Sequence, residues 1–323
     1  MSHTTKKSIG IIGGGGYTAG ELIRLLVHHP EVEIKYIYSQ SQAGKQVSDV
    51  HGDMLTHPHL TFSYEPAEAD VIFLCQGHGK ARAFLEQFSF SPETIIIDLG
   101  NDHRIDNKNW VYGLPELHKN TIKNATRIAN CGCFATAIQL AVLPLAANGL
   151  LSSDIHVSAI TGSTGAGQNP SPTTHFSWRN NNVSIYKAFS HQHEAEVYQS
   201  IHSLQENYTG KIWFLPHRGN FSRGILASVY TPYSGSQEEA YELYNSFYGD
   251  HPFAQASQSP IHLKQVVNTN HCFLRPTVSD GMILIESILD NLLKGASGQA
   301  VQNMNLALNF PENTGLNLKS IAY

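Results

Sequence analysis

The sequence has few of the features that mark several large protein classes. Only four cysteines occur among its 323 residues, Cys75, Cys131, Cys133 and Cys272, which is too few for a disulfide-stapled scaffold. No apolar run approaches the ~20 residues of a membrane-spanning helix. The first residues also lack the long apolar stretch and the cleavage site of a signal peptide. We therefore expect a cytoplasmic protein with no membrane partner.

Basic charge is scarce as well. The 26 Asp and Glu residues outnumber the 21 Lys and Arg residues, the net charge is -5, and no basic stripe marks a nucleic-acid surface. There are 18 histidines, yet no HExxH motif occurs and no cysteine pair has zinc-finger spacing. We expect neither a nucleic-acid partner nor a bound metal.

Short apolar runs alternate with helical patterns up to about residue 130. Runs of this kind are buried on both faces of a sheet, and their alternation with helices predicts parallel strands. The sequence therefore predicts a first domain of the α/β class. The predicted strands are 8–13, 34–38, 71–75, 94–98 and 127–130, and the predicted helices are 20–29 and 80–88.

The pattern changes after residue 130. A long apolar helix comes first, and the stretches that follow carry the alternating and aromatic residues of a large sheet. This predicts a second, sheet-rich domain. The predicted helices are 134–147, 236–248 and most of 291–308, and the predicted strands are 155–160, 211–215, 225–231 and 282–288.

A glycine-rich loop joins the first predicted strand to the first predicted helix. Glycines there permit a tight turn and let a pyrophosphate approach the amides at the helix N-terminus. The loop lacks the Gly-Lys-Ser/Thr ending of an ATP-binding P-loop, so we expect a dinucleotide. The candidate contacts are Gly13, Gly14, Gly15, Gly16, Tyr17, Thr18 and Ala19.

The end of the second strand indicates which dinucleotide binds. NAD-binding proteins usually place a carboxylate there to hold the ribose 2′-hydroxyl. Here Glu33 lies at the opposite end of the strand, and the residues that follow the strand include Ser39, Ser41 and Lys45. Hydroxyls and a lysine suit a 2′-phosphate, so NADPH is the expected cofactor. The alternative is an ordinary polar loop.

Cys133 opens the apolar helix that follows the predicted strand 127–130. The positive end of the helix dipole and the amide N–H groups there favour thiolate, the nucleophilic form of cysteine. The same amides can hold an oxyanion. Position alone leaves open whether Cys133 reacts or is a small buried residue.

The residues around Cys133 resemble a family signature. Asn130-Cys-Gly-Cys-Phe-Ala-Thr136 resembles Asn-Pro-Gly-Cys-Tyr/Phe-Ala-Thr of the N-acetyl-γ-glutamyl-phosphate reductases, with Cys131 at the proline and Cys133 at the nucleophile. The similar motifs occur in family order and run from about residue 9 to residue 316. The other similar segments are Gly16–Leu26, Tyr112-Gly-Leu-Pro-Glu-Leu117 and Asp290–Met304.

Two histidine segments resemble family segments that bear on acid–base chemistry, for which histidine is suited near neutral pH. His191-Gln-His193-Glu-Ala-Glu196 resembles His-x-His-x-x-Glu, which implies His191 as the acid–base residue with His193 and Glu196 in support. His217 is the second candidate. Its segment, Pro216–Gly224, resembles Pro-His-Leu-Val-Pro-Met-x-Arg-Gly but differs in the middle.

The loop Thr161–Gly167 follows a predicted strand, and its amides and hydroxyls suit a phosphate or carboxylate. It resembles a family Ser-Gly-Ala-Gly-Arg, with Gln168 at the arginine. Arg104, Arg218 and Arg223 remain alternatives for a substrate carboxylate. The resemblance implies Arg104, Asn130, Ser163 and Thr164 for the substrate, and Gly165 and Asn291 for the cofactor.

The resemblance also implies a fold and a reaction. The fold is a Rossmann domain (1–132 and 291–323) plus an α+β catalytic and dimerisation domain of the glyceraldehyde-phosphate dehydrogenase C-terminal type (133–290). The reaction is NADPH-dependent reduction of N-acetylglutamyl 5-phosphate to the 5-semialdehyde through a Cys133 thioester, in arginine biosynthesis. We expect this acyl phosphate as the small-molecule partner, and a homo-oligomer, either a dimer or a tetramer.

Other interpretations stay open at this point. The substrate could carry an N-succinyl group instead of N-acetyl. Aspartate-semialdehyde dehydrogenase and glyceraldehyde-phosphate dehydrogenase share the mechanism, but the Tyr112 motif and the C-terminal segment argue against both. A cysteine hydrolase and a non-catalytic NADPH-binding regulator are the alternatives from other classes.

Overall fold

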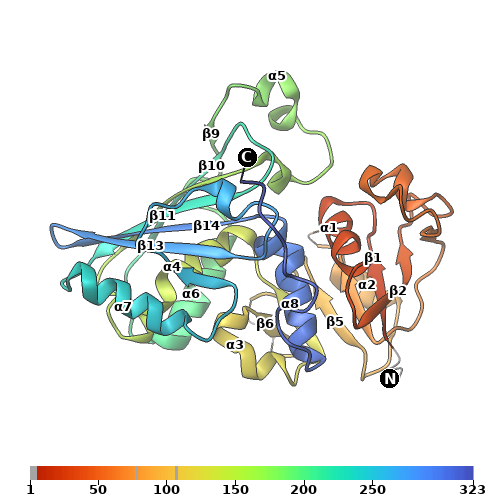
Figure 1. Ribbon diagram of the computed structural model, residues 1–323, viewed down its shortest axis with the longest axis horizontal. Coiled ribbons are helices and arrows are strands. Elements are labelled where there is room, and N and C mark those ends of the chain that lie inside the picture. The colour runs from red at the N-terminus through yellow and green to blue at the C-terminus, as the bar shows by residue number, and fades with distance from the viewer. Residues whose placement is uncertain (1–5, 78, 106–107, 323) are drawn as a thin grey trace. The chain divides into compact units, whose positions relative to one another are not determined.

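The computed structural model describes residues 6–77, 79–105 and 108–322. Residues 1–5, on which part of the signal-peptide prediction rests, lie outside this set. The chain divides into two compact units, each built on its own sheet (Figure 1). The first unit is Met1–Cys131 with Ala296–Asn317, and the second is Gly132–Gly295 with Leu318–Tyr323.

The first unit contains a seven-stranded parallel sheet. Its strands are β1 (Lys7–Ile12), β2 (Val32–Tyr38), β3 (Phe62–Ser63), β4 (Val71–Leu74), β5 (Ile95–Asp98), β6 (Val111–Gly113) and β7 (Arg127–Asn130). Its helices are α1 (Tyr17–Leu26), α2 (Ala81–Gln87), α3 (Pro115–Ile122) and α8 (Gly298–Ala307). The strand order β3-β2-β1-β4-β5-β7-β6 changes direction between β1 and β4, and ligands of open α/β sheets bind beyond the carboxyl ends of the strands at such a point.

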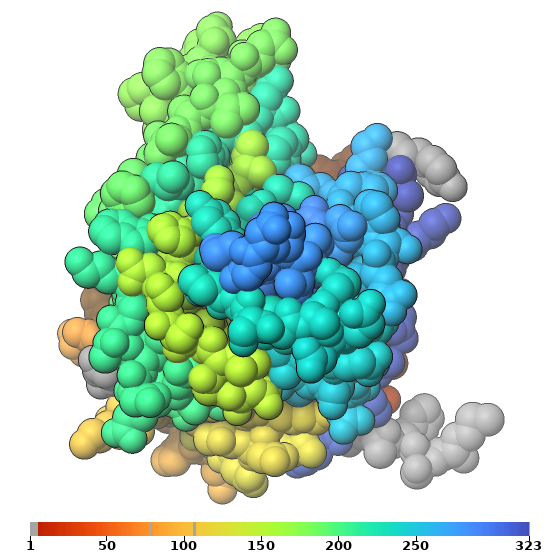
Figure 2. All heavy atoms as spheres, turned by 90° about the vertical axis from the view of Figure 1, so that its left-hand side faces the viewer, coloured from red at the N-terminus to blue at the C-terminus, as the bar shows by residue number. Residues whose placement is uncertain are grey.

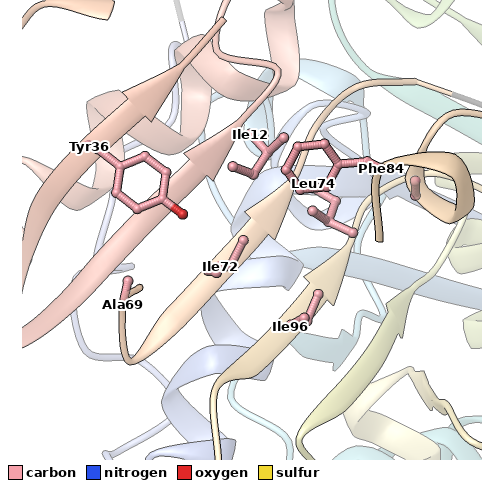
Figure 3. Packing of buried hydrophobic residues seen from close by; sticks show 8 residues of the cluster. Ile12, Tyr36, Ala69, Ile72, Leu74, Phe84 and Ile96 are labelled. Carbon is pink, nitrogen blue, oxygen red and sulfur yellow. The ribbon is translucent and has the colours of Figure 1, made fainter. Parts of the chain in front are cut away.

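Short apolar strands form the core of the first unit. All four residues of β4 are buried, and so are all four of β5, because helices cover both faces of a parallel sheet. Figure 3 shows Phe84 of α2 directed at Leu74 and Ile12 on the strands. Full burial of such a side chain contributes about 1.5–3 kcal/mol, so the apolar runs that predicted the strands also stabilise them.

The second unit contains a seven-stranded mixed sheet in the order β12-β13-β14-β11-β8-β10-β9. Its strands are β8 (Ile155–Thr161), β9 (Ser184–Ile185), β10 (Ile212–Arg218), β11 (Ile225–Pro232), β12 (Ala254–Ala256), β13 (Cys272–Ser279) and β14 (Met282–Leu289). Its helices are α4 (Cys133–Ala147), α5 (Phe176–Arg179), α6 (His193–Leu204) and α7 (Gln237–Tyr248). In Figure 1, α4, α6 and α7 lie along one side of this sheet.

Alternate residues of the central strands β8 and β11 are buried, as expected for a sheet covered by helices on one face. The connection between β8 and β10 carries α5, β9 and α6. Its part around α5 forms the green projection at the top of Figure 2. It contains five of the exposed large apolar residues of the chain, Phe176, Trp178, Val183, Ile185 and Phe189.

The predicted fold class is confirmed, with local corrections. Helix α1 begins at Tyr17 rather than at residue 20, because Gly16 is its N-cap. The predicted helix 291–308 consists of a π-helical turn, Leu293–Ser297, followed by α8. The longest elements that were not predicted from the sequence are α3, α6 and β13, and the short elements α5, β3, β6, β9 and β12 were not predicted either. Within the part of the chain that the structure describes, no helix has the length and apolar character needed to cross a membrane.

Candidate active site

The glycine-rich loop of the first unit leads from β1 into α1. Gly13 has a φ of +85°, and a Cβ there would lie 2.8 Å from the backbone carbon of Cys75, so this turn requires glycine. Gly16 caps α1 without a side-chain hydrogen bond, and nothing lies within 4 Å of the place of its Cβ. The first amides of α1 are therefore accessible to a pyrophosphate. The other predicted contacts are Gly14 and Gly15 in the loop, and Tyr17, Thr18 and Ala19 in the first turn of α1.

Polar side chains gather beside this loop at the end of β2. Ser39 Oγ and Gln42 Cγ each lie 3.7 Å from a Cβ built on Gly15. Gln42 Oε1 accepts a hydrogen bond from Lys45 Nζ at 3.0 Å, and Gln42 Nε2 donates to Ser41 Oγ at 3.4 Å. Residues 39–45 hold no carboxylate. This arrangement of hydroxyls and a cation fits a ribose 2′-phosphate.

The first unit also holds two predicted substrate residues. Arg104 is buried, and its Nη2 donates to the carbonyl of Leu99 at 3.0 Å. Asn130 is buried at the end of β7, where its Nδ2 donates to the carbonyl of Ala296 and its Oδ1 accepts from Asn303 Nδ2, each at 3.0 Å. The Asn130 amide thus links the end of β7 to Ala296 and to Asn303 of α8 through hydrogen bonds of both its nitrogen and its oxygen.

Cys133 is the first residue of α4 in the second unit. Its N-cap, Gly132, is extended and provides no side-chain hydrogen bond, so the first amides of the helix have no capping side chain. Cys133 is partly exposed, whereas Cys75, Cys131 and Cys272 are buried, and none of the four forms a disulfide. Exposure at a helix N-terminus is the setting that favours a reactive thiolate.

A buried histidine and a buried glutamate hold the turn before Cys133. Glu196 Oε2 accepts a hydrogen bond from the amide of Gly132 at 2.9 Å, and His193 Nε2 lies 3.9 Å from Glu196 Oε1. A Cβ on Gly132 would lie within 2.7 Å of the His193 atoms Nε2, Cδ2 and Cε1. Position 132 is therefore glycine because the His193 ring occupies the space of a side chain. His193 and Glu196 reach the turn together because they are three residues apart on α6.

His191 lies two residues before His193 in an aromatic enclosure. Its ring makes edge contacts with Phe134 and Phe214, at centroid distances of 5.6 and 5.3 Å, and its centroid lies 4.5 Å from that of His193. Phe134 is the neighbour of Cys133 in α4. The predicted pair His191 and Cys133 is thus linked through packed side chains of the same unit.

Burial keeps the His191 ring neutral. It lowers the pKa of His191 to about 4, and repulsion from Lys187 and Arg218 adds to the effect. Nδ1 of His191 accepts a hydrogen bond from the amide of His193 at 3.3 Å, so the neutral ring carries its proton on Nε2. At pH 7 His191 is therefore a hydrogen-bond donor through Nε2.

His217 lies on strand β10 with a different orientation. Side chains of a strand alternate between its faces, and Phe214 of the same strand is directed at Phe134 and His191. His217, three residues further along, lies on the opposite face. This geometry favours His191 over His217 as the residue that serves Cys133.

The loop Thr161–Gly167 differs from the expected anion-binding nest. The amides of Ser163 and Thr164 donate to the carbonyls of Phe221 and Ser222, at 2.8 and 3.2 Å, and the amide of Gly165 donates within the loop. These amides are already used inside the protein, and the contact of Ser163 and Thr164 with the substrate stays a prediction. The hydroxyl of Thr164 also donates to the carbonyl of Ser222, at 2.6 Å.

Asn291 is buried next to this loop. Its Nδ2 donates to Thr164 Oγ1 at 3.0 Å, and its Oδ1 accepts from the amide of Gly224 at 2.7 Å. Asn291 therefore clamps the loop to the start of β11. The placing of Asn291 near the cofactor stays a prediction.

Tyr186, which follows β9, was not among the residues predicted for the site. Burial raises the pKa of Tyr186 to about 12, the charge of Cys133 adds to this effect, and Arg218 opposes it. The Arg218 guanidinium lies 4.5 Å from the centroid of the Tyr186 ring. No pattern around Tyr186 signalled this position.

Among the described residues, no group of three or more His, Cys, Asp or Glu could hold a metal.

Comparison with known families covers both units. The family model "Semialdehyde dehydrogenase, NAD binding domain" matches residues 8–125, and "Semialdehyde dehydrogenase, dimerisation domain" matches residues 133–291. Among solved structures, an aspartate semialdehyde dehydrogenase II from Vibrio cholerae is similar with a TM-score of 0.72 at 14% identity, over 95% of this chain and 99% of that one. An aspartate semialdehyde dehydrogenase with NADP from Candida albicans has a TM-score of 0.68 at 13% identity, over 96% and 100%. Identities this low show a shared fold.

Curated relatives are much more similar in sequence. An N-acetyl-gamma-glutamyl-phosphate reductase from Christiangramia forsetii is 55% identical over 314 residues, which cover 96% of this chain and 98% of the relative. Reductases of the same name from Parabacteroides distasonis and Flavobacterium johnsoniae are 52% and 50% identical, over 97% of this chain and 99% and 98% of their own lengths. The chain belongs to the N-acetyl-gamma-glutamyl-phosphate reductases, within the semialdehyde dehydrogenase family.

Proposed function

We propose that this chain reduces N-acetyl-γ-glutamyl phosphate with NADPH, giving N-acetylglutamate 5-semialdehyde and phosphate as a step of arginine biosynthesis. The observation that carries this proposal is the position of Cys133. In a chain of this family, it is the partly exposed cysteine at the N-terminus of α4, and it follows a turn held by Glu196.

The covalent step takes place at Cys133. The thiolate attacks the acyl carbon of the substrate, and a carbon–sulfur bond forms. The bond from that carbon to the phosphate oxygen breaks, and phosphate leaves with the electron pair, so a thioester remains on Cys133. The first amides of α4, which have no capping side chain, stabilise the negative charge that develops on the carbonyl oxygen.

The first unit binds the cofactor in this proposal. The loop from Gly13 to Ala19 and the start of α1 hold the pyrophosphate, and Ser39, Ser41 and Lys45 hold the 2′-phosphate. When bound, NADPH supplies the hydride that turns the thioester into the semialdehyde. Cys133 then leaves as thiolate and is ready for the next turnover.

His191 stabilises charge in this scheme rather than carrying a proton through each cycle. Once Cys133 is a thiolate, neither bond exchange needs a net proton. A neutral ring with its proton on Nε2 therefore serves best as a hydrogen-bond donor to the tetrahedral intermediates. His193 and Glu196 are positioning residues, because they hold the turn at Gly132.

We also propose how the chain assembles and where it works. The second unit, which matches the dimerisation domain, makes the subunit contacts of a homodimer or tetramer. The enzyme works in the cytoplasm, where thiols such as Cys133 stay reduced.

The reverse reaction tests this function. The wild type should reduce NADP⁺ with N-acetylglutamate 5-semialdehyde over repeated turnovers only when phosphate is present. Cys133→Ser should abolish this activity, whereas Cys131→Ser should retain it because Cys131 is buried two residues away. Activity that persists in Cys133→Ser would contradict the proposal. NADPH binding without turnover in the wild type would favour a regulator, and semialdehyde or ester chemistry without any nucleotide would favour a hydrolase.

A further inference from the structure

Two of the four arginines of the second unit differ from the others. Arg223 pairs with Asp290 at 3.0 Å, and Arg275 pairs with Glu286 at 2.9 Å. Arg179 and Arg218 pair with no carboxylate among the residues that the structure describes. The second unit therefore contains two arginines whose charge no carboxylate of the described residues compensates.

These two arginines lie together where the projection meets the sheet. Arg179, at the end of α5, is buried, and its Nη1 donates to the carbonyl of Arg218 at 2.6 Å. Its other acceptors are the carbonyls of Thr173 and Asn182 and the hydroxyl of Ser184. All are neutral, so they fix the guanidinium in place and leave its charge intact.

Each of the two side chains also has an unsatisfied buried donor. The Nε atoms of Arg179 and Arg218 are buried, and neither has a hydrogen-bond partner within the described residues. Buried donors of charged groups are normally satisfied, since leaving them without an acceptor is unfavourable. Adjacent positive groups with unused donors are the composition of an anion-binding position.

A series of ring contacts leads from Arg218 toward the start of α4. Its guanidinium lies 4.5 Å from the centroid of the Tyr186 ring, and the Tyr186 ring contacts that of His191 at 5.8 Å. His191 in turn contacts Phe134, the neighbour of Cys133. Arg218 shares the Phe214 face of β10 by strand alternation. A chain of ring contacts thus connects the arginine to the first turn of α4.

The sequence around these residues is consistent with a changed anion contact. The family segment that Pro216–Gly224 resembles has leucine at the place of Arg218, and the segment near Gly167 has arginine at the place of Gln168. Gln168 is exposed. Compared with the family segments, this chain therefore lacks a guanidinium at position 168 and has one at position 218.

We propose that Arg218, seated on the Tyr186 ring and supported by Arg179, binds an oxyanion of the substrate. The proposal rests on the proposed function. It defines the ligand as an oxyanion, and the experiment below identifies the substrate group that carries it. A guanidinium fork matches the phosphoryl group on the reacting carbon and a carboxylate of the acylated glutamate equally well. The carboxylate can be that of glutamate or the second carboxylate of a dicarboxylic acyl group such as succinyl.

Steady-state kinetics in the reverse direction separate these sources, because phosphate and semialdehyde are then independent substrates. Arg218→Leu should raise the KM of one of them about ten- to a hundredfold, the effect of losing a charged hydrogen bond. A higher KM for phosphate would show that Arg218 binds the phosphoryl group. A higher KM for the semialdehyde would show that Arg218 binds a carboxylate. A higher KM for N-succinylglutamate semialdehyde, with an unchanged KM for N-acetylglutamate semialdehyde, would show that Arg218 binds the carboxylate of the acyl group. Arg218→Lys, which keeps the charge but not the fork, should show an intermediate rise.

Lys211→Leu is the matched control. Lys211 is also a cation over an aromatic ring, 5.5 Å from the centroid of Trp213, and it lies just before the same strand. Its substitution should leave both KM values within about twofold. Unchanged KM values in Arg218→Leu, or an equal change in Lys211→Leu, would overturn the proposal.

A second measurement does not depend on turnover. Inorganic phosphate, N-acetylglutamate and N-succinylglutamate are each tested for protection of Cys133 against alkylation by iodoacetamide. At least one should protect the wild type at a concentration about tenfold or more below that needed for Arg218→Leu. Equal protection of both proteins by all three would overturn the anion site even if the proposed reaction holds. Protection that depends on Arg218 in a chain without reductase activity would support the anion site and refute the proposed reaction.

Discussion

Gly132→Ala tests how the turn before Cys133 is built. The backbone of Gly132 is extended, with φ −71° and ψ 148°, so alanine fits the backbone and the effect is steric. The new Cβ would lie within 2.7 Å of three atoms of the His193 ring, whereas nonbonded atoms prefer about 3.5–4.0 Å. The ring or the turn must therefore move by about 1 Å. Neither moves freely, because His193 is buried against His191 and Glu196 holds the amide of Gly132.

Two terms add to the cost of this substitution. Overpacking costs about 1–3 kcal/mol, and alanine is a poorer N-cap than glycine by up to about 1 kcal/mol. A displacement of about 1 Å beside the nucleophile lowers kcat by about a hundredfold. Urea unfolding and steady-state kinetics measure both effects.

A double-mutant cycle with His193→Ala separates the two terms. Without the ring, Gly132→Ala should lose only the capping contribution, so the coupling between the two positions should be about 1–3 kcal/mol. If the two substitutions are additive within about 0.5 kcal/mol, the ring does not occupy the space beside Gly132. The account of this turn would then be refuted.

Three other predictions concern the same residues and the cofactor. Burial lowers the pKa of His191 from 6.5 to about 4, so between these values the unfolded chain binds a proton that the folded chain does not, and stability falls as the pH falls. His191→Gln should remove up to roughly 3 kcal/mol of this pH dependence, and equal slopes of unfolding free energy between pH 7 and 4 for both proteins would contradict the assignment. Glu196→Ala should cost about 1–3 kcal/mol, since it leaves the Gly132 amide buried without an acceptor, whereas Glu196→Gln keeps a carbonyl oxygen and should cost less in urea unfolding. Ser39→Asp places a carboxylate at the end of β2, so the ratio of kcat/KM for NADPH to that for NADH should fall at least about tenfold, and an unchanged ratio would show that the 2′-phosphate binds elsewhere.

Local patterns were sufficient to predict the fold class and the place of Cys133 at the start of a helix. The apolar runs in 71–75 and 94–98 predicted buried parallel strands, because a strand that is buried on both faces is apolar at nearly every position rather than at alternate ones. The strand, the short turn and the apolar helix that follow one another in the sequence predicted a helix start at Cys133, whereas the resemblance to the family signature implied its role as nucleophile. Strand β13 was missed; Pro276 lies inside it, and proline is unfavourable within a paired strand.

Pairings between distant residues could not be predicted. Arg218 and Arg223 are five residues apart and equally basic, and only the structure shows that Arg223 is paired with Asp290, 67 residues away. The space beside Gly132 is filled by His193 from α6, an element that the sequence did not predict. The hydrogen bonds from the Asn291 amide to Thr164 and Gly224 were not predicted either, because tertiary packing decides which polar groups are used internally.

The thioester on Cys133 is the central claim, and a single-turnover experiment without phosphate tests it most directly. N-acetylglutamate 5-semialdehyde and NADP⁺ should give a burst of about one NADPH per protein chain and then stop, because the acyl group cannot leave Cys133 without phosphate. Mass spectrometry should find the acyl group on the Cys133 peptide, and added phosphate should release it. Steady turnover without phosphate, or a full burst in Cys133→Ser, would contradict the account.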